Sequence, residues 1–314
     1  MLARVADNLY WFSRYLRRAE NMARLVNVCS QLQLDLPRAG RIQWRPLVDA
    51  MGAAAVFDAL QADPEVDAGE ADIVRFLLVA PDNPFSLQAA VHQAREILRT
   101  IRETLPQDCW LAINDLYLYM QANAERVTIR RYRQDVLDRV VDSCLRVSAL
   151  LGANASRDIG YQFLRLGTAI EQADMTTRCI DAAASGLIQF RSPDEGEALQ
   201  VLPWMSVLQS LAGYQMYRRH MRQRVTMEAV LRFLLQNGEF PRSVLFCLRR
   251  VESVLPAMPP RVAVGQALQL VLETLTSAGT PALAEATPRA FLDELQIGLA
   301  GLHDSIQESY LRPG

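Results

Sequence analysis

The strongest constraint on the fold is that the chain repeats itself. Residues 74–86 read VRFLLVAPDNPFS and residues 231–243 read LRFLLQNGEFPRS, so six residues recur at the same positions 157 residues later. Two further blocks recur in the same order, with only small shifts in offset. One is residues 5–26, which match 159–180, and the other is residues 44–51, which match 204–211. Three ordered matches predict a tandem duplication.

The apolar residues of the repeated blocks are spaced for helices, at steps of three and four. Asp82-Asn83-Pro84 forms a turn that can start a helix, with Ser86 as its cap. Residues 129–151 have the same helical spacing, and Gly152 offers a stop. The segments 33–40, 189–197 and 279–288 are interpreted as loops.

The pattern therefore predicts an all-α, multi-helix bundle with two pseudo-symmetric halves, residues 1–152 and 153–314, in one compact unit. The apolar stripe of the first helix contains Val5, Leu9, Phe12, Leu16, Ala19, Ala23 and Val26, and its counterpart contains Ile159, Phe163, Leu166, Ile170, Ala173, Thr177 and Ile180.

Composition excludes several kinds of chemistry. All 33 basic residues are arginine, so no Schiff base, lysine general base or P-loop lysine exists in this sequence. The net charge of −2 gives no overall positive field for DNA.

Five widely spaced cysteines without a CxxC motif predict buried, reduced thiols in a cytoplasmic protein. Charges interrupt the N-terminal segment, and no run of about 18 apolar residues exists, so we expect neither a signal peptide nor a membrane span.

A polar stripe lies beside the apolar one on the first helix and has a counterpart in the second half. An acid followed four residues later by arginine occurs in both, as Glu20 with Arg24 and as Asp174 with Arg178. This is the favoured order for a helical ion pair. Such pairs are common on solvated faces, but if the stripes face inward they form a cleft rich in acid and arginine. The stripes contain Ser13, Arg17, Glu20, Arg24 and Asn27, and Gly167, Glu171, Asp174, Arg178 and Asp181.

These residues also carry a family resemblance. The segment 2–11, LARVADNLYW, followed by RYLRRAENMARL at 14–25, resembles the opening of the bacterial Alpha-E domain family, which is named for a recurring Glu/Arg motif. Further matches, at residues 76–84, 94–96, 170–175 and 241–248, span almost the whole chain. The family's opening usually reads Leu-Glu-Arg-Ala-Glu, and this chain has Arg17 in place of the first Glu, whereas the second half keeps Glu171.

The resemblance implies a helical protein and a set of neighbouring genes, but it does not imply a reaction. Members tend to be encoded beside, or fused to, circularly permuted ATP-grasp ligase-like proteins, with transglutaminase-like proteins as frequent neighbours. This implies a pathway that forms or trims amide bonds in peptides.

No complete catalytic motif is found. The three histidines lie far apart and no metal-binding motif appears, so we expect no metal and no cofactor. Cys179 aligns with Leu25 and is interpreted as packing. Two arginine clusters, at 126–133 and 218–224, could bind RNA, but the acidic pI favours a solvated or subunit-contacting helix face.

Two hypotheses follow. In the first, the chain is a non-catalytic helical accessory subunit that binds an ATP-grasp-type ligase or its carboxylate or peptide substrate. In the second, it is itself an enzyme that acts on an amide or an amino-acid carboxylate. Both use the same candidate residues: Arg14, Arg17, Glu20, Arg24, Glu171, Asp174 and Arg178.

Overall fold

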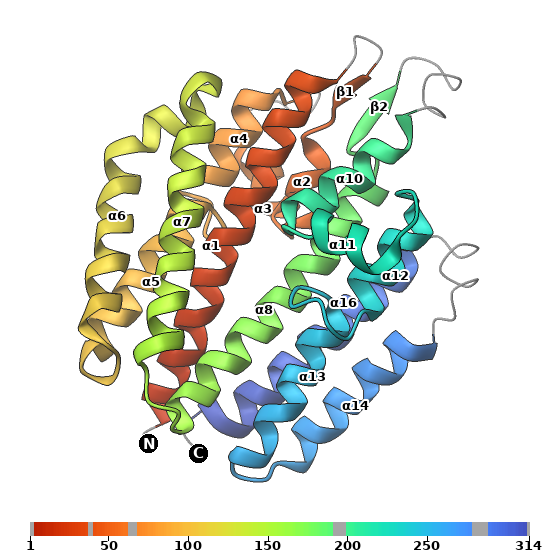
Figure 1. Ribbon diagram of the computed structural model, residues 1–314. Helices are drawn as coiled ribbons and strands as arrows, with labels where there is room; N and C mark the ends of the chain where they lie inside the picture. Colours follow the sequence, from red (N-terminus) through yellow and green to blue (C-terminus); the bar gives the residue numbers. More distant parts are fainter. Residues whose placement is uncertain (1–2, 37–39, 62–67, 191–198, 278–287, 313–314) are drawn as a thin grey trace.

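The computed structural model describes residues 3–36, 40–61, 68–190, 199–277 and 288–312. Within them the chain forms fourteen α-helices and one short two-stranded sheet, so the all-α prediction is confirmed (Figure 1). The first half contains α1 (Ala3–Asp35), β1 (Gly40–Ile42), α2 (Arg45–Ala50), α3 (Ala54–Leu60), α4 (Glu70–Leu78), α5 (Leu87–Ile101), the 3-10 turn η1 (Arg102–Thr104), α6 (Gln107–Thr128) and α7 (Arg130–Asn154).

The second half has a closely similar order of elements. It contains α8 (Ile159–Ala184), β2 (Ile188–Phe190), α10 (Val201–Ser210), α11 (Tyr214–Met221), α12 (Met227–Gln236), α13 (Val244–Val254), η2 (Leu255–Ala257), α14 (Val262–Ser277), α16 (Pro288–Ile306) and the π turn η3 (Gln307–Leu311).

Helices α1 and α8 form the centre of the bundle. Helix α1 packs against α5, α7, α8 and α10, while α8 also packs against α13 and α16. In Figure 1 the two helices run through the middle, with α5 to α7 on one side and α13, α14 and α16 on the other. The predicted apolar stripes are buried except at their first residues, Val5 and Ile159, which are half-buried. Burial of a side chain such as Phe12 contributes about 1.5–3 kcal/mol.

Side-chain caps begin several helices, and two of them fall at corresponding places in the two halves. Ser86 accepts a hydrogen bond from the Ala89 amide at the start of α5, as predicted. Ser243 accepts one from the Phe246 amide at the start of α13. These caps satisfy amides that the first turn of a helix leaves free.

Some predicted boundaries are wrong. The segment 33–40 is not all loop, because α1 continues to Asp35 and Gly40 begins a strand. Gln189 belongs to β2, which pairs antiparallel with β1. Gly152 does not stop α7, which runs to Asn154; a glycine in a last turn is tolerated when the surrounding residues still favour helix. Most of the third predicted loop, 279–288, lies outside the described residues, and α16 begins at its end.

The first arginine cluster is not a solvated face throughout. Arg133 is buried, and its guanidinium donates to Ser30 Oγ and to Glu70. The same group donates to the carbonyls of Val127 and Thr128, so it joins α7 to α1 and α4. In the second cluster the four arginines, Arg218, Arg219, Arg222 and Arg224, are exposed.

All five cysteines are buried and unbonded to one another, as predicted. Burial raises the pKa of Cys179 to about 12, which agrees with its interpretation as packing. No helix in the described parts of the chain has an apolar stretch long enough to cross a membrane.

The close approach of α1 and α8 depends on one glycine. A Cβ atom at Gly167 would lie 2.2 Å from Ser13 Oγ and 2.3 Å from the Tyr10 carbonyl oxygen. Since the obstacle includes backbone, a side chain here would force the helices apart. Ser13 itself donates to that carbonyl at 2.8 Å.

We expect Gly167→Ala to destabilise the protein by about 1–3 kcal/mol, because the added methyl group overpacks the crossing. Gly152→Ala is the matched control, because a Cβ there meets no atom within 4 Å. The control is expected to stabilise α7 by roughly 0.5–1 kcal/mol. Urea unfolding of both variants checks this, and equal effects would contradict the proposed close crossing.

Candidate functional site

Each polar stripe contributes one buried carboxylate near the crossing of α1 and α8, Glu20 from α1 and Glu171 from α8. Glu171 of α8 is 0% exposed and accepts from Arg14 Nε at 2.7 Å. Arg18, also on α1, donates to the same carboxylate from Nε at 2.6 Å and from Nη2 at 3.0 Å. Burial by itself raises the pKa of Glu171, but the charges of Arg18 and Arg14 outweigh it and lower the pKa to about 2. Glu171 is therefore an ionised anchor between the helices.

Arg14 is the more enclosed of the two arginines. Its Nη1 is buried without a hydrogen-bond partner among the described residues, and its Cζ lies 4.9 Å from the centre of the Trp11 ring. A cation over an indole face recovers part of the cost of desolvation. Arg14 is thus held by a carboxylate on one side and an aromatic ring on the other.

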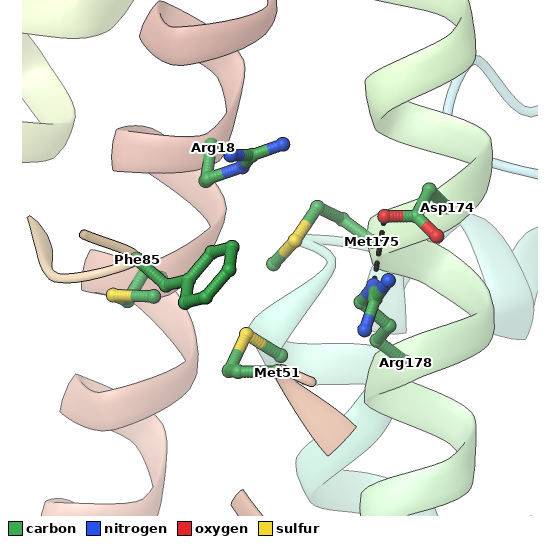
Figure 2. Close-up of a pocket in the computed structure, with 7 residues that line it drawn as sticks. Arg18, Met51, Phe85, Asp174, Met175 and Arg178 are labelled. Atoms are coloured by element: carbon green, nitrogen blue, oxygen red, sulfur yellow. Dashed lines mark hydrogen bonds and ion pairs between the residues drawn. The ribbon is translucent and has the colours of Figure 1, made fainter. Parts of the chain in front are cut away.

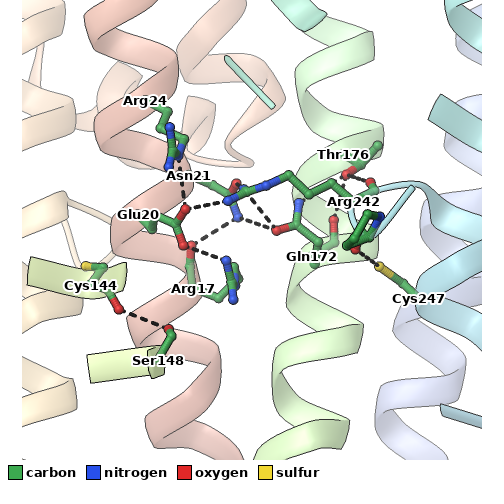
Figure 3. Close-up of polar contacts among 11 residues, drawn as sticks. Arg17, Glu20, Asn21, Arg24, Cys144, Ser148, Gln172, Thr176, Arg242 and Cys247 are labelled. Carbon is green, nitrogen blue, oxygen red and sulfur yellow. Dashed lines mark hydrogen bonds and ion pairs between the residues drawn. The ribbon is translucent and has the colours of Figure 1, made fainter. Parts of the chain in front are cut away.

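Glu20 forms a second buried anchor, drawn in Figure 3. Its carboxylate pairs with Arg17 and with Arg24 of the same helix, the latter at 3.0 Å from Nε to Oε1. Arg242, which comes just before α13, also pairs with Oε1. Burial tends to raise the pKa of Glu20, but Arg17 and Arg242 lower it to about 2. Glu20 therefore joins α1 to the segment before α13.

A set of neutral polar groups continues this anchor across to α8. Arg242 Nη1 donates to Asn21 Oδ1 at 2.9 Å and to Gln172 Oε1 at 3.2 Å. The Arg242 carbonyl accepts from Thr176 Oγ1 at 2.7 Å (Figure 3). The network has contributions from three segments that are far apart in sequence, so it also fixes how they pack.

Asp174 and Arg178 line a small cavity on the other side of the crossing (Figure 2). Arg178 Nε donates to Asp174 Oδ2 at 2.7 Å, and Arg178 Nη1 donates to the Ala50 carbonyl at 2.7 Å. The cavity is about 60 Å³, enough for a few water molecules or one carboxylate group. Its other lining residues are Arg18, Met22, Met51, Phe85 and Met175.

All seven candidate residues thus lie on α1 and α8, and both i,i+4 pairs form as predicted. They do not line one open cleft, because Glu20 and Glu171 are enclosed by arginines. Two further residues, Arg18 and Arg242, also bind the buried carboxylates and are not among the residues predicted from sequence. Arg18 stands in the quoted opening motif, but Arg242 lies 222 residues from Glu20 in the chain, and no local spacing points to their contact.

His303 of α16 contacts Tyr10 of α1 beside the Glu171 cluster. Tyr10 Oη and His303 Nδ1 lie 2.8 Å apart, and the two rings stack with centroids at 5.6 Å. Burial, and secondly the charge of Arg14, lower the pKa of His303 to about 4. The imidazole is therefore neutral at physiological pH, and α16 is joined to α1 by an uncharged contact. Among the described residues, no three metal-ligating side chains gather at this or any other place.

Glu171→Gln should cost about 3–5 kcal/mol, because it leaves Arg14 and Arg18 without their shared buried counter-charge. Chemical denaturation of the purified variant measures the loss. Glu125→Gln is the control: Glu125 pairs with Arg75 on the surface, and the midpoint should not move. A loss no larger in the first variant than in the second would show that the buried pair is not an anchor.

The low pKa of His303 gives a pH dependence with a defined sign. Between its ordinary pKa of 6.5 and the folded value of about 4, the unfolded chain binds a proton that the folded chain refuses. This residue therefore lowers stability as the pH falls through that window. We expect the difference in Tm between wild type and His303→Gln to shrink from pH 7 to pH 4.5, and a constant difference would contradict the assignment.

Comparison with known proteins identifies the family but no activity. The family model described as a predicted alpha-helical domain with a conserved ER motif, named Alpha-E, matches residues 1–311. An uncharacterized protein of Mycobacterium bovis and one of Mycobacterium tuberculosis are each 25% identical over 326 residues. These alignments cover 97% of this chain and 36% of each relative, so the chain spans about a third of the relatives' length.

No solved structure matches the chain. The family model extends over nearly all of the sequence and contains both anchored helices, α1 and α8. The chain therefore belongs to the Alpha-E family.

Proposed function

We propose that this chain is a non-catalytic helical subunit of an ATP-grasp-type amide ligase system, and that it binds the ligase or its carboxylate or peptide substrate. The observation that carries the proposal is the state of the two buried glutamates. Each is neutralised by two or three arginines and serves to join helices.

That state is unsuited to proton transfer. A general acid or base works best with a pKa near the working pH. The pKa values of Glu20 and Glu171 are both lowered to about 2, so neither group exchanges protons readily at neutral pH. The cluster supports a rigid frame that presents binding surfaces.

The length of the relatives supports a role beside other domains. In the mycobacterial proteins the matched region is about a third of a longer polypeptide. We therefore expect this helical unit to act together with another protein domain. The choice of an ATP-grasp-type ligase as that partner rests on the family resemblance.

We further infer that the two halves, 1–152 and 153–314, arose by tandem duplication. The repeated order of elements and the matching serine caps of α5 and α13 support this origin. We also propose a cytoplasmic location, which agrees with five buried, unbonded thiols.

Reconstitution tests the function. The chain and the ATP-grasp-type protein encoded beside it should co-purify, and the rate of ATP turnover with a carboxylate substrate should rise several-fold when the chain is added. Glu125→Gln, altered only on the surface, should act like wild type. A ligase that neither binds the chain nor responds to it would refute the proposal.

A catalytic alternative is favoured by one observation, the cavity beside Asp174 and Arg178. There Arg178 would hold a carboxylate and Asp174 would take up a proton. If this holds, the purified chain alone should turn over an amide or amino-acid substrate, and Asp174→Asn should abolish the turnover. Full pathway output from Asp174→Asn would exclude it.

A further inference from the structure

Beside the Glu20 anchor lies a recess whose lining contains more arginines than the anchor pairs with carboxylates. Its inner part is a cavity of about 140 Å³ beside Gln172 and Cys247. Three of the eight lining residues are arginines, Arg17, Arg242 and Arg250, and none is an acid. A cavity of roughly 150 Å³ accommodates a benzene molecule, so this one has room for a carboxylate or phosphate group.

An outer cavity of about 500 Å³ adjoins it, because Pro241 and Arg250 line both. Arg165 and Arg249 add two more cations to the outer part, where Phe246 supplies an apolar surface. The lining again contains no acid. Five arginines therefore line these two adjoining cavities, which together are called the recess.

Positive charge is in local excess here. Arg17 and Arg242 share the single carboxylate of Glu20, which Arg24 also contacts. Within the described residues, neither Arg249 nor Arg250 has a carboxylate at ion-pair distance.

The crowding also affects the proton affinities of the arginines. Burial, and then the charge of Arg250, lower the pKa of Arg165. Burial lowers the pKa of Arg17, and Arg242 adds to the effect. An anion placed among these groups would relieve the repulsion.

The first half shows that the fold does not require these charges. Counted from the caps Ser86 and Ser243, Gln93 holds the place in α5 that Arg250 holds in α13, and His92 likewise corresponds to Arg249. Those two residues line a cavity of about 410 Å³ that contains no arginine. The same backbone positions thus accept side chains other than arginine, and Arg249 and Arg250 are specific to the second half.

We propose that this recess, the arginine recess of Arg17, Arg165, Arg242, Arg249 and Arg250, binds a small polyanion with one anionic group in the inner cavity and another in the outer. Planar guanidinium groups suit carboxylates and phosphates equally, so the shared chemistry is a chain of two or more such groups. Phe246 and Pro241 would contact the stem between them. The inference deepens the proposed substrate-binding role, but it can be tested without any ligase.

Isothermal titration with two probes, a tri-glutamate peptide and tripolyphosphate, tests the recess at low ionic strength. We expect saturable, one-site binding of at least one probe. Tighter binding of the peptide would identify carboxylates as the ligand, and tighter binding of tripolyphosphate would identify phosphates. Saturation by neither probe at millimolar concentration would overturn the proposal.

Substitutions in the recess, with a control substitution elsewhere, test whether the probes bind there. Arg250→Gln and Arg249→His copy the side chains of the first half, so the fold should survive, and each should weaken binding about tenfold. Arg146→Gln removes the same charge from an exposed position on α7 and should leave affinity unchanged. Unchanged affinity in Arg250→Gln, or equal weakening in Arg146→Gln, would refute the site. If the variants no longer bind the probes but still stimulate the ligase, the recess has no part in that stimulation and the proposed function stands.

Discussion

Burial of two glutamates at the crossing of α1 and α8 is the constraint on which the rest of the structure depends. A carboxylate removed from water is costly unless cations replace its hydration, and here arginines of α1, together with Arg242 from the segment before α13, do so. Gly167 allows the helix axes to come close enough for these contacts. The outer helices then pack on a centre whose geometry is fixed by charge as well as by apolar burial.

Much of the fold could be predicted from spacing. The apolar steps in residues 5–26 and 159–180 predict two helices with one apolar face each, and Ser86 predicts the start of α5. Both kinds of signal are local, since they depend on residues within one or two helical turns. Helix ends were less predictable: α1 continues to Asp35, and α7 passes Gly152, because tertiary packing extends helices beyond the point where propensity would end them.

The site was only partly predictable for the same reason. Glu20 with Arg24 and Asp174 with Arg178 are neighbours along one helix, so their pairing follows from sequence. Arg242 contacts Glu20 across most of the chain, and periodicity contains no information about such a contact. The cluster that contains Arg133 is predicted to be a solvated or subunit-contacting face, and its burial is not foreseen because its partner, Glu70, lies on a different helix. Which charges are buried is decided by the packing of helices.

The two-stranded ribbon has a consequence for how the protein can be made. Strands β1 and β2 follow the two central helices and come from opposite halves, and the Gln43 amide extends their pairing by donating to the Leu187 carbonyl at 2.8 Å. Either half produced alone would present an unpaired strand edge together with an uncompensated buried charge, which are features that promote aggregation. The halves are therefore expected to fold only in each other's presence, so that neither could be lost, or evolve as a free-standing module, without the other.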